Sequence, residues 1–116
     1  MREHREPMTL LSSPVLEMAN LDVIPGREAE FEVAFVQAVR LIASIPGYQG
    51  HALRRCVENP LRYLMLVGWE RLEDHTKGFR NSPEYLEWSV LLHPYYDPFP
   101  VVEHYEVVCG ENGAPV

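Results

Sequence analysis

The chain has 116 residues, enough for one domain with a single modest hydrophobic core. Its hydrophobic fraction of 47% and charged fraction of 23% are those of a globular protein, and no apolar run approaches the roughly 20 residues of a membrane span. The net charge of −7 argues against nucleic acid or an anionic membrane as a partner. The basic first residues precede too short an apolar segment for a secretory signal, so we expect a cytoplasmic protein.

The chain begins with a predicted arm and a first strand. Residues 1–13 mix charges with Pro and Ser and show no period, so we expect a flexible arm before a single domain at 14–109. A disordered tail is expected at 110–116. Alternating residues predict a strand over 15–23. Its two faces carry Leu16, Met18 and Asn20 on one side, and Glu17, Ala19 and Leu21 on the other.

A long helix and a second strand are predicted next. Apolar residues recur at three- and four-residue spacing over 27–44, which is typical of an amphipathic helix. Glu28 and Glu30 lie near its positive N-terminal end, where carboxylates are favourable. The Pro-Gly pair at 46–47 ends this helix, and a strand follows over 48–57.

The second half of the chain predicts a hairpin strand, two helical segments and a last strand. The strand over 63–70 is apolar at nearly every position, which indicates burial on both faces. Ser82 is the predicted N-cap of the second helical segment, with Pro83 at its first position. The other predicted segments are a turn at 58–60, a short helix over 72–80, a helix that ends near 93–94, an aromatic loop at 95–100 and a strand over 101–108.

This β-α-β-β-α-β order predicts an α+β, ferredoxin-like fold with a four-stranded antiparallel sheet. In that arrangement both helices cover the same face of the sheet. The third strand is nevertheless apolar on both sides. Leu64 and Leu66 lie on one side, and the other side carries Tyr63, Met65, Val67 and Trp69. The uncovered face therefore needs another cover, most simply the same sheet of a second copy, and we expect a homodimer.

Several short motifs recur in a fixed order through the predicted domain. They are Pro-Gly-Arg-Glu at 25–28, Pro-Gly-Tyr at 46–48, Trp69-Glu70, Asp74-His75, and Ser82-Pro83 followed by Tyr85. In order and spacing they resemble the antibiotic biosynthesis monooxygenase family, over roughly residues 15 to 108. Members of this family are dimeric α+β barrels, so the resemblance implies that two sheets close into one barrel.

The resemblance implies an oxygenase. Some family members attack quinols, anthrones and other polycyclic phenols with O2 and without metal or flavin, some degrade haem, and some have no established activity. A phenol that has lost its proton can pass an electron to O2. Such an enzyme needs a dry apolar pocket, a base for the phenol proton and donors that favour the anion. We therefore expect a cofactor-independent monooxygenase of a small aromatic substrate.

The resemblance also implies site residues. His75 is the expected base or orienter, and Asn20 is the expected neutral donor from the first strand. Both are expected to face a closed pocket between the sheet and the helices. Trp69 and Phe79 are expected as apolar walls. Further aromatic surface for a flat substrate is expected from Tyr63, Tyr85, Trp88 and Tyr95.

Structural roles compete with each of these assignments. His75 shares a helix face with Leu72 and Phe79 and could simply hold two helical segments together. A Trp at a position such as Trp69 is more often part of the core than a pocket wall. A non-catalytic barrel that binds a small apolar ligand is the alternative function; it predicts a filled core, a His75 bonded to backbone and no O2 consumption. The histidines show no HxH or HExxH spacing, so no metal site is predicted.

The haem-degrading branch fits the sequence less well. Its members use an Asn on the first strand, a Trp in the helix after the third strand and a His as iron ligand. Asn20 roughly matches the first of these. Phe79 stands at the Trp position and Ser89 at the His position, with His93 one turn further on.

Overall fold

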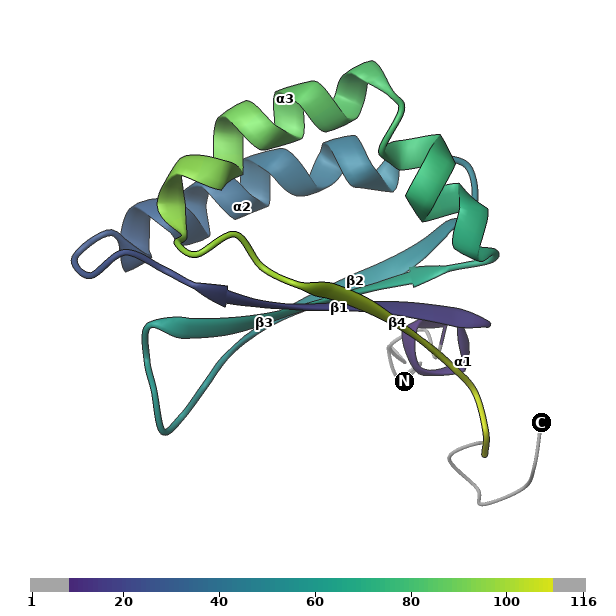
Figure 1. Ribbon diagram of the computed structural model, residues 1–116, viewed down its shortest axis with the longest axis horizontal. Helices are drawn as coiled ribbons and strands as arrows, with labels where there is room; N and C mark the ends of the chain where they lie inside the picture. The colour runs from purple at the N-terminus through teal and green to yellow at the C-terminus, as the bar shows by residue number, and fades with distance from the viewer. Residues whose placement is uncertain (1–8, 110–116) are drawn as a thin grey trace, which may run out of the picture.

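A four-stranded antiparallel sheet with helices on one face forms the body of the protein (Figure 1). The computed structural model describes residues 9–109. The strands lie in the order β2-β3-β1-β4, and every pair is antiparallel, which confirms the predicted α+β, ferredoxin-like fold. The elements are α1 (Thr9–Ser12), β1 (Val15–Asp22), α2 (Glu28–Ala43), β2 (Tyr48–Arg55), β3 (Arg62–Trp69), η1 (Asp74–Phe79), α3 (Pro83–Leu92), η2 (His93–Tyr95) and β4 (Val102–Glu106).

The described end of the predicted arm is helical. The short helix α1 lies on the sheet face opposite to α2 and α3 (Figure 1). A Cβ at Gly68 of β3 would collide with the hydroxyl of Ser13 and contact Leu10, so a glycine lets this segment approach the sheet. The short helix α1 differs from the loose arm expected through residue 13, and the flexibility of that arm stays a prediction. Residues 1–8 and 110–116, including the predicted tail, lie outside the described residues.

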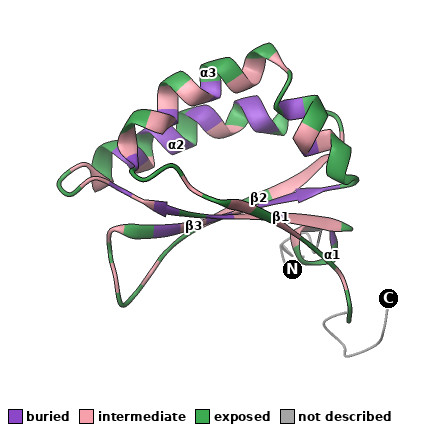
Figure 2. Cartoon of the chain, in the orientation of Figure 1, coloured by how far each residue is buried: buried purple, intermediate pink, exposed green. Residues whose placement is uncertain are grey.

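The core lies between α2, α3 and the covered face of the sheet (Figure 2). Helix α2 directs Phe31, Phe35 and Ile42 into it, as its apolar spacing predicts. The rings of Phe31 and Tyr63 meet edge to face with centroids 5.0 Å apart, a favourable geometry for aromatic pairs. From the sheet, alternate residues of β1 and β3 enter the core: Ala19, Leu21, Tyr63, Met65, Val67 and Trp69.

A π-helical turn follows β3 and carries His75. In η1 the backbone N–H of Arg80 donates to the carbonyl of His75 (3.1 Å), and both His75 and Phe79 point into the core. Such turns are rare and are frequent at functional sites. The next helix, α3, begins as predicted, since the Ser82 hydroxyl accepts a hydrogen bond from the backbone N–H of Tyr85 (3.2 Å).

The loop before β2 helps to position η1, and Gly47 is its sensitive point. Gly47 has φ +95°, and a Cβ there would collide with the Asp74 carboxylate, which accepts from the backbone N–H of Arg71 (3.0 Å). Gly47→Ala should therefore lower the free energy of unfolding by about 2 kcal/mol. Gly26→Ala is the matched control, because Gly26 has φ +88° but no atom within 4 Å of the added Cβ. Equal losses in urea unfolding would show that the contact with Asp74 contributes nothing.

Within residues 9–109, no helix is long and apolar enough to cross a membrane. The cytoplasmic location expected from the sequence stays a prediction.

Candidate active site

A small cavity lies between the covered face of the sheet and the helices. Its volume is about 30 Å³, room for one or two water molecules. Its walls come from β1, β3, β4, η1, α3 and the loop before β4. Four of the predicted site residues line it: His75, Phe79, Tyr85 and Trp88.

The other four predicted site residues do not line this cavity. Asn20 is exposed on the opposite face of the sheet, because β1 alternates and turns its odd-numbered residues toward the helices. The prediction that Asn20 and His75 face one pocket was therefore wrong. Tyr63 donates its hydroxyl proton to Glu32 of α2 (2.5 Å). The ring of Tyr95 lies under the guanidinium of Arg27, 4.6 Å from it.

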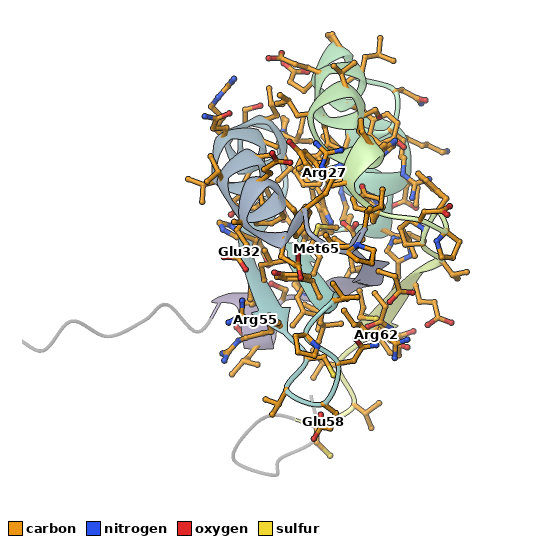
Figure 3. All side chains as sticks on the ribbon, turned by 90° about the vertical axis from the view of Figure 1, so that its left-hand side faces the viewer. Arg27, Glu32, Arg55, Glu58, Arg62 and Met65 are labelled. Carbon is orange, nitrogen blue, oxygen red and sulfur yellow. The ribbon has the colours of Figure 1, made fainter. Side chains whose placement is uncertain are left out.

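Tyr63 belongs to a separate polar cluster on the edge of the sheet. Glu32 of α2 also binds Arg55 of β2, with 3.0 Å between Nη1 and Oε2. Figure 3 shows these two side chains pointing toward one another across the gap between helix and strand. The cluster ties α2 to β2, and Tyr63 has a structural partner there.

Glu17 of β1 is a buried carboxyl at the cavity wall. Its side chain is 3% exposed, and the indole N–H of Trp69 donates to its Oε1 (2.9 Å). Nε2 of His75 lies 3.5 Å from the same oxygen. Burial raises the pKa of Glu17 to about 7, and the Trp69 hydrogen bond and the charge of Arg80 lower that pKa by less.

His75 is fully buried between two aromatic rings. Its imidazole stacks on Trp69 (centroids 5.5 Å apart) and on Phe79 (6.2 Å). Its Nδ1 lies 2.8 Å from Nε2 of His104 on β4, so one of the two rings donates to the other. Burial lowers the pKa of His75 to about 3, helped by the charges of Arg80 and His104. The imidazole is therefore neutral at neutral pH and serves as a hydrogen-bonding group.

Phenol and imidazole groups close the other side of the cavity. Burial raises the pKa of Tyr96, so its hydroxyl stays protonated. Burial also lowers the pKa of His93, whose ring meets Phe99 edge to face at 4.9 Å. This wall is neutral and largely apolar, so the field in the cavity comes mainly from Glu17 and Arg80.

Glu17 and His104 were not predicted as site residues. The sequence held a signal for Glu17, since a carboxylate shares the strand face of Ala19 and Leu21, where an apolar residue is expected. For His104 the signal is the pairing of β1 with β4, which sets His104 directly opposite Glu17. Sequence spacing alone does not reveal that pairing.

The residue at the ligand position of the haem-degrading branch offers no iron ligand. Ser89, at the position where the haem-degrading branch has its His, donates its hydroxyl proton to the Tyr85 carbonyl (2.9 Å). Between residues 9 and 109, no group of three or more His, Cys, Asp or Glu side chains is arranged to hold a metal ion.

Two proteins are similar to this chain in sequence. Protein YczJ of Bacillus subtilis, which is uncharacterized, is 53% identical over 94 residues, or 81% of this chain and 99% of YczJ. Protein SchA of Streptomyces halstedii is 32% identical over 92 residues, which is 78% of this chain. The chain matches only 24% of the length of SchA.

Solved structures share the fold. A candidate antibiotic biosynthesis monooxygenase of Bordetella bronchiseptica is 38% identical, with a TM-score of 0.78, over 81% of this chain and 96% of that one. SnoaB of Streptomyces nogalater, a cofactor-independent oxygenase, matches with 19% identity and a TM-score of 0.69, over 82% of this chain and 94% of its own. The profile of the antibiotic biosynthesis monooxygenase family matches residues 14–90, most of the described domain. With that match and the 38% identity to the Bordetella bronchiseptica protein, the chain belongs to the antibiotic biosynthesis monooxygenase family.

Proposed function

We propose that the protein is a cofactor-independent monooxygenase that uses O2 to oxidise a quinol, an anthrone or another aromatic phenol. The observation that carries the proposal is the buried pair Glu17 and His75 at the wall of an aromatic cavity, in a chain of this family. Titratable groups with shifted pKa values that meet in a cavity are the default candidates for an active site. The description of SnoaB as a cofactor-independent oxygenase supports the same chemistry.

The reaction needs no external reductant. In an anthrone the carbon opposite the phenol oxygen becomes a carbonyl; one oxygen atom of O2 enters it and the other leaves as water. Removal of the phenol proton raises the electron density of the ring, so the substrate itself supplies the electrons. The chain contributes a group that accepts this proton, a neutral hydrogen-bonding imidazole at His75 and apolar walls from Phe79 and Trp88.

The small volume of the cavity is relevant to the alternative function, a non-catalytic barrel that binds a small apolar ligand. About 30 Å³ is far below the roughly 300 Å³ of a typical ligand pocket, so a substrate must displace part of the wall. The loop side is the part to displace, because Phe99 is mostly exposed and Pro100 follows it outside any strand. A nearly filled core is what the non-catalytic barrel predicts. That alternative also predicts a hydrogen bond from His75 to the backbone, whereas His75 is bonded to the side chain of His104.

Uptake of O2 by metal-stripped protein, with a panel of hydroquinones and anthrones, tests the function. We expect uptake above the spontaneous rate, and a loss of about 10²-fold or more in His75→Gln. Glutamine replaces alanine because His75 is fully buried between two rings, and a void there would destabilise the fold. His51→Gln, on the exposed part of β2, is the control and should keep the wild-type rate. No uptake with any compound would favour the binding barrel.

We also propose that the protein works as a homodimer whose two sheets face one another. On the sheet face opposite to α2 and α3, which α1 approaches at Gly68, Leu64 and Leu66 of β3 and Leu16 and Met18 of β1 are only partly buried within one chain. A contiguous apolar face of this kind is typical of an interface. Face-to-face packing of two copies would bury it and bring Asn20, which pairs with Leu64, to the interface.

Sedimentation at micromolar concentration tests the dimer. Leu66→Glu should convert it to monomer, because the change buries a charge in an apolar interface at a cost of several kcal/mol. Val90→Glu is the control, since Val90 is a 75% exposed apolar residue on the outer side of α3. A wild-type protein that sediments as a monomer, or a Leu66→Glu variant that stays dimeric, would contradict the proposed interface.

A further inference from the structure

The carboxyl of Glu17 is buried without a full cationic partner. Among residues 9–109, no Lys or Arg lies within ion-pair distance of it, and its near neighbours are the Trp69 N–H and the imidazole of His75. A buried carboxylate costs several kcal/mol unless a cation or several donors compensate it. An apolar residue in its place would continue the pattern of Ala19 and Leu21. Glu17 therefore destabilises the folded protein, which indicates that its carboxyl serves a function.

A line of three side chains leads from Glu17 across the sheet. Oε1 of Glu17 lies 3.5 Å from Nε2 of His75, and Nδ1 of His75 lies 2.8 Å from Nε2 of His104. They come from β1, η1 and β4, and the pairing of β1 with β4 sets Glu17 and His104 opposite each other. The 3.5 Å step must shorten by about 0.5 Å to become a good hydrogen bond, as often happens when a substrate binds.

The two ends of this line lie in different places. Glu17 and His75 line the inner cavity. His104 is half-buried and lines a separate, open groove with Pro14, Leu72 and Tyr105. The line therefore connects a nearly closed cavity with the surface of the protein.

We propose that Glu17 takes the proton of the substrate and that His75 and His104 carry a proton from it to the outer groove, an inference that rests on the proposed function. The substrate O–H bond breaks, its electron pair stays on the oxygen, and the proton binds Glu17. Glu17 passes it to Nε2 of His75, whose Nδ1 gives its own proton to Nε2 of His104. His104 releases the proton of its Nδ1 to water. The same path in reverse returns a proton to the oxygen atom that leaves as water, and this restores the starting tautomers of both rings. Neither imidazole keeps an extra charge.

The charges around Glu17 agree with this division of roles. A pKa of about 7 suits a group that must bind and release a proton at neutral pH, whereas burial keeps the pKa of His75 near 3, so that ring relays without storing charge. On β4, His104 lies opposite Glu17 in the strand pairing. The other titratable and charged groups that line the cavity with Glu17 are His75, Arg80, Tyr85, His93 and Tyr96.

Infrared spectroscopy after a pH jump tests the relay without any substrate. The C=O band of a protonated carboxyl that titrates near pH 7 should be present in the wild type and absent in Glu17→Gln. In His104→Phe, which fills the space but cannot accept a proton, the rate of Glu17 protonation should fall about tenfold or more. Added imidazole should restore the rate in His104→Ala. His51→Gln, which removes an imidazole from β2 and lines neither the inner cavity nor the outer groove, should match the wild type. An unchanged rate in His104→Phe would overturn the relay.

Activity separates this inference from the proposed function. Glu17→Gln should reduce O2 uptake by about 10²–10⁴-fold, as for loss of a general base, while urea unfolding shows that it remains folded. Wild-type uptake in Glu17→Gln would overturn the role of Glu17 and leave the monooxygenase function intact. If the wild type itself consumes no O2, both the proposed function and the claim that Glu17 takes a substrate proton are overturned. The pH-jump experiment then decides by itself whether protons move along Glu17, His75 and His104.

Discussion

Glu17→Gln should gain about 3 kcal/mol of stability relative to the wild type as the pH rises from 4.5 to 7. The pKa of this carboxyl is 4.5 in the unfolded chain and about 7 in the folded protein. Within that window the unfolded chain has released its proton while the folded protein still holds one. The wild type therefore loses stability as the pH rises, and glutamine, which does not titrate, removes the loss.

His75→Gln should show the opposite trend. The pKa of His75 is 6.5 in the unfolded chain and about 3 in the folded protein. As the pH falls below 6.5, the unfolded chain gains a proton that the folded protein does not bind, so the wild type loses stability. Between pH 6.5 and 4.5 this proton binding should cost the wild type about 2 kcal/mol of stability that the variant does not lose. In the wild type the two effects oppose each other over this range.

Urea unfolding of the wild type and both variants between pH 4.5 and 7 measures these slopes. Taking each variant relative to the wild type removes the contributions of His51 and His93, whose pKa values are also lowered by burial. Parallel pH profiles for all three proteins would show that neither Glu17 nor His75 titrates abnormally. The variant pair thus tests the electrostatics of the site separately from its activity.

Trp69→Phe should lower the free energy of unfolding by about 3 kcal/mol. The change leaves a void in a fully buried site and removes the N–H that donates to Glu17 (2.9 Å). That hydrogen bond lowers the pKa of Glu17, so its loss raises the pKa further. The destabilisation should therefore be larger at pH 7 and above, where the carboxylate needs its donor, than at pH 4.5.

Trp88→Phe is the matched control for the indole hydrogen bond. Trp88 is 4% exposed and packs edge to face on Phe79 (5.6 Å) and Phe35 (6.1 Å), so its replacement leaves a similar void. It should cost about 1–2 kcal/mol at every pH, because it removes packing but no donor to Glu17. Equal pH dependence in the two variants would show that the indole of Trp69 acts only through packing.

The sequence by itself determined the order and type of the main elements. The Pro-Gly pairs end β1 and α2, the spacing of Phe31, Phe35 and Ile42 selects the buried side of α2, and Ser82 caps α3 as predicted. These are local signals, because propensity, periodicity and capping depend on neighbours along the chain. They also placed His75 in a helical turn next to the end of β3.

Only the tertiary structure decided which side chains meet. Leu16 and Met18 are as apolar as Ala19 and Leu21, so the pattern of β1 did not show which face the helices cover, and Asn20 was assigned to the wrong side. The same choice of face buries Glu17 with Trp69 and His75. The site combines residues 17, 75 and 104, and their proximity comes from strand pairing and helix packing, which act between segments far apart in the chain.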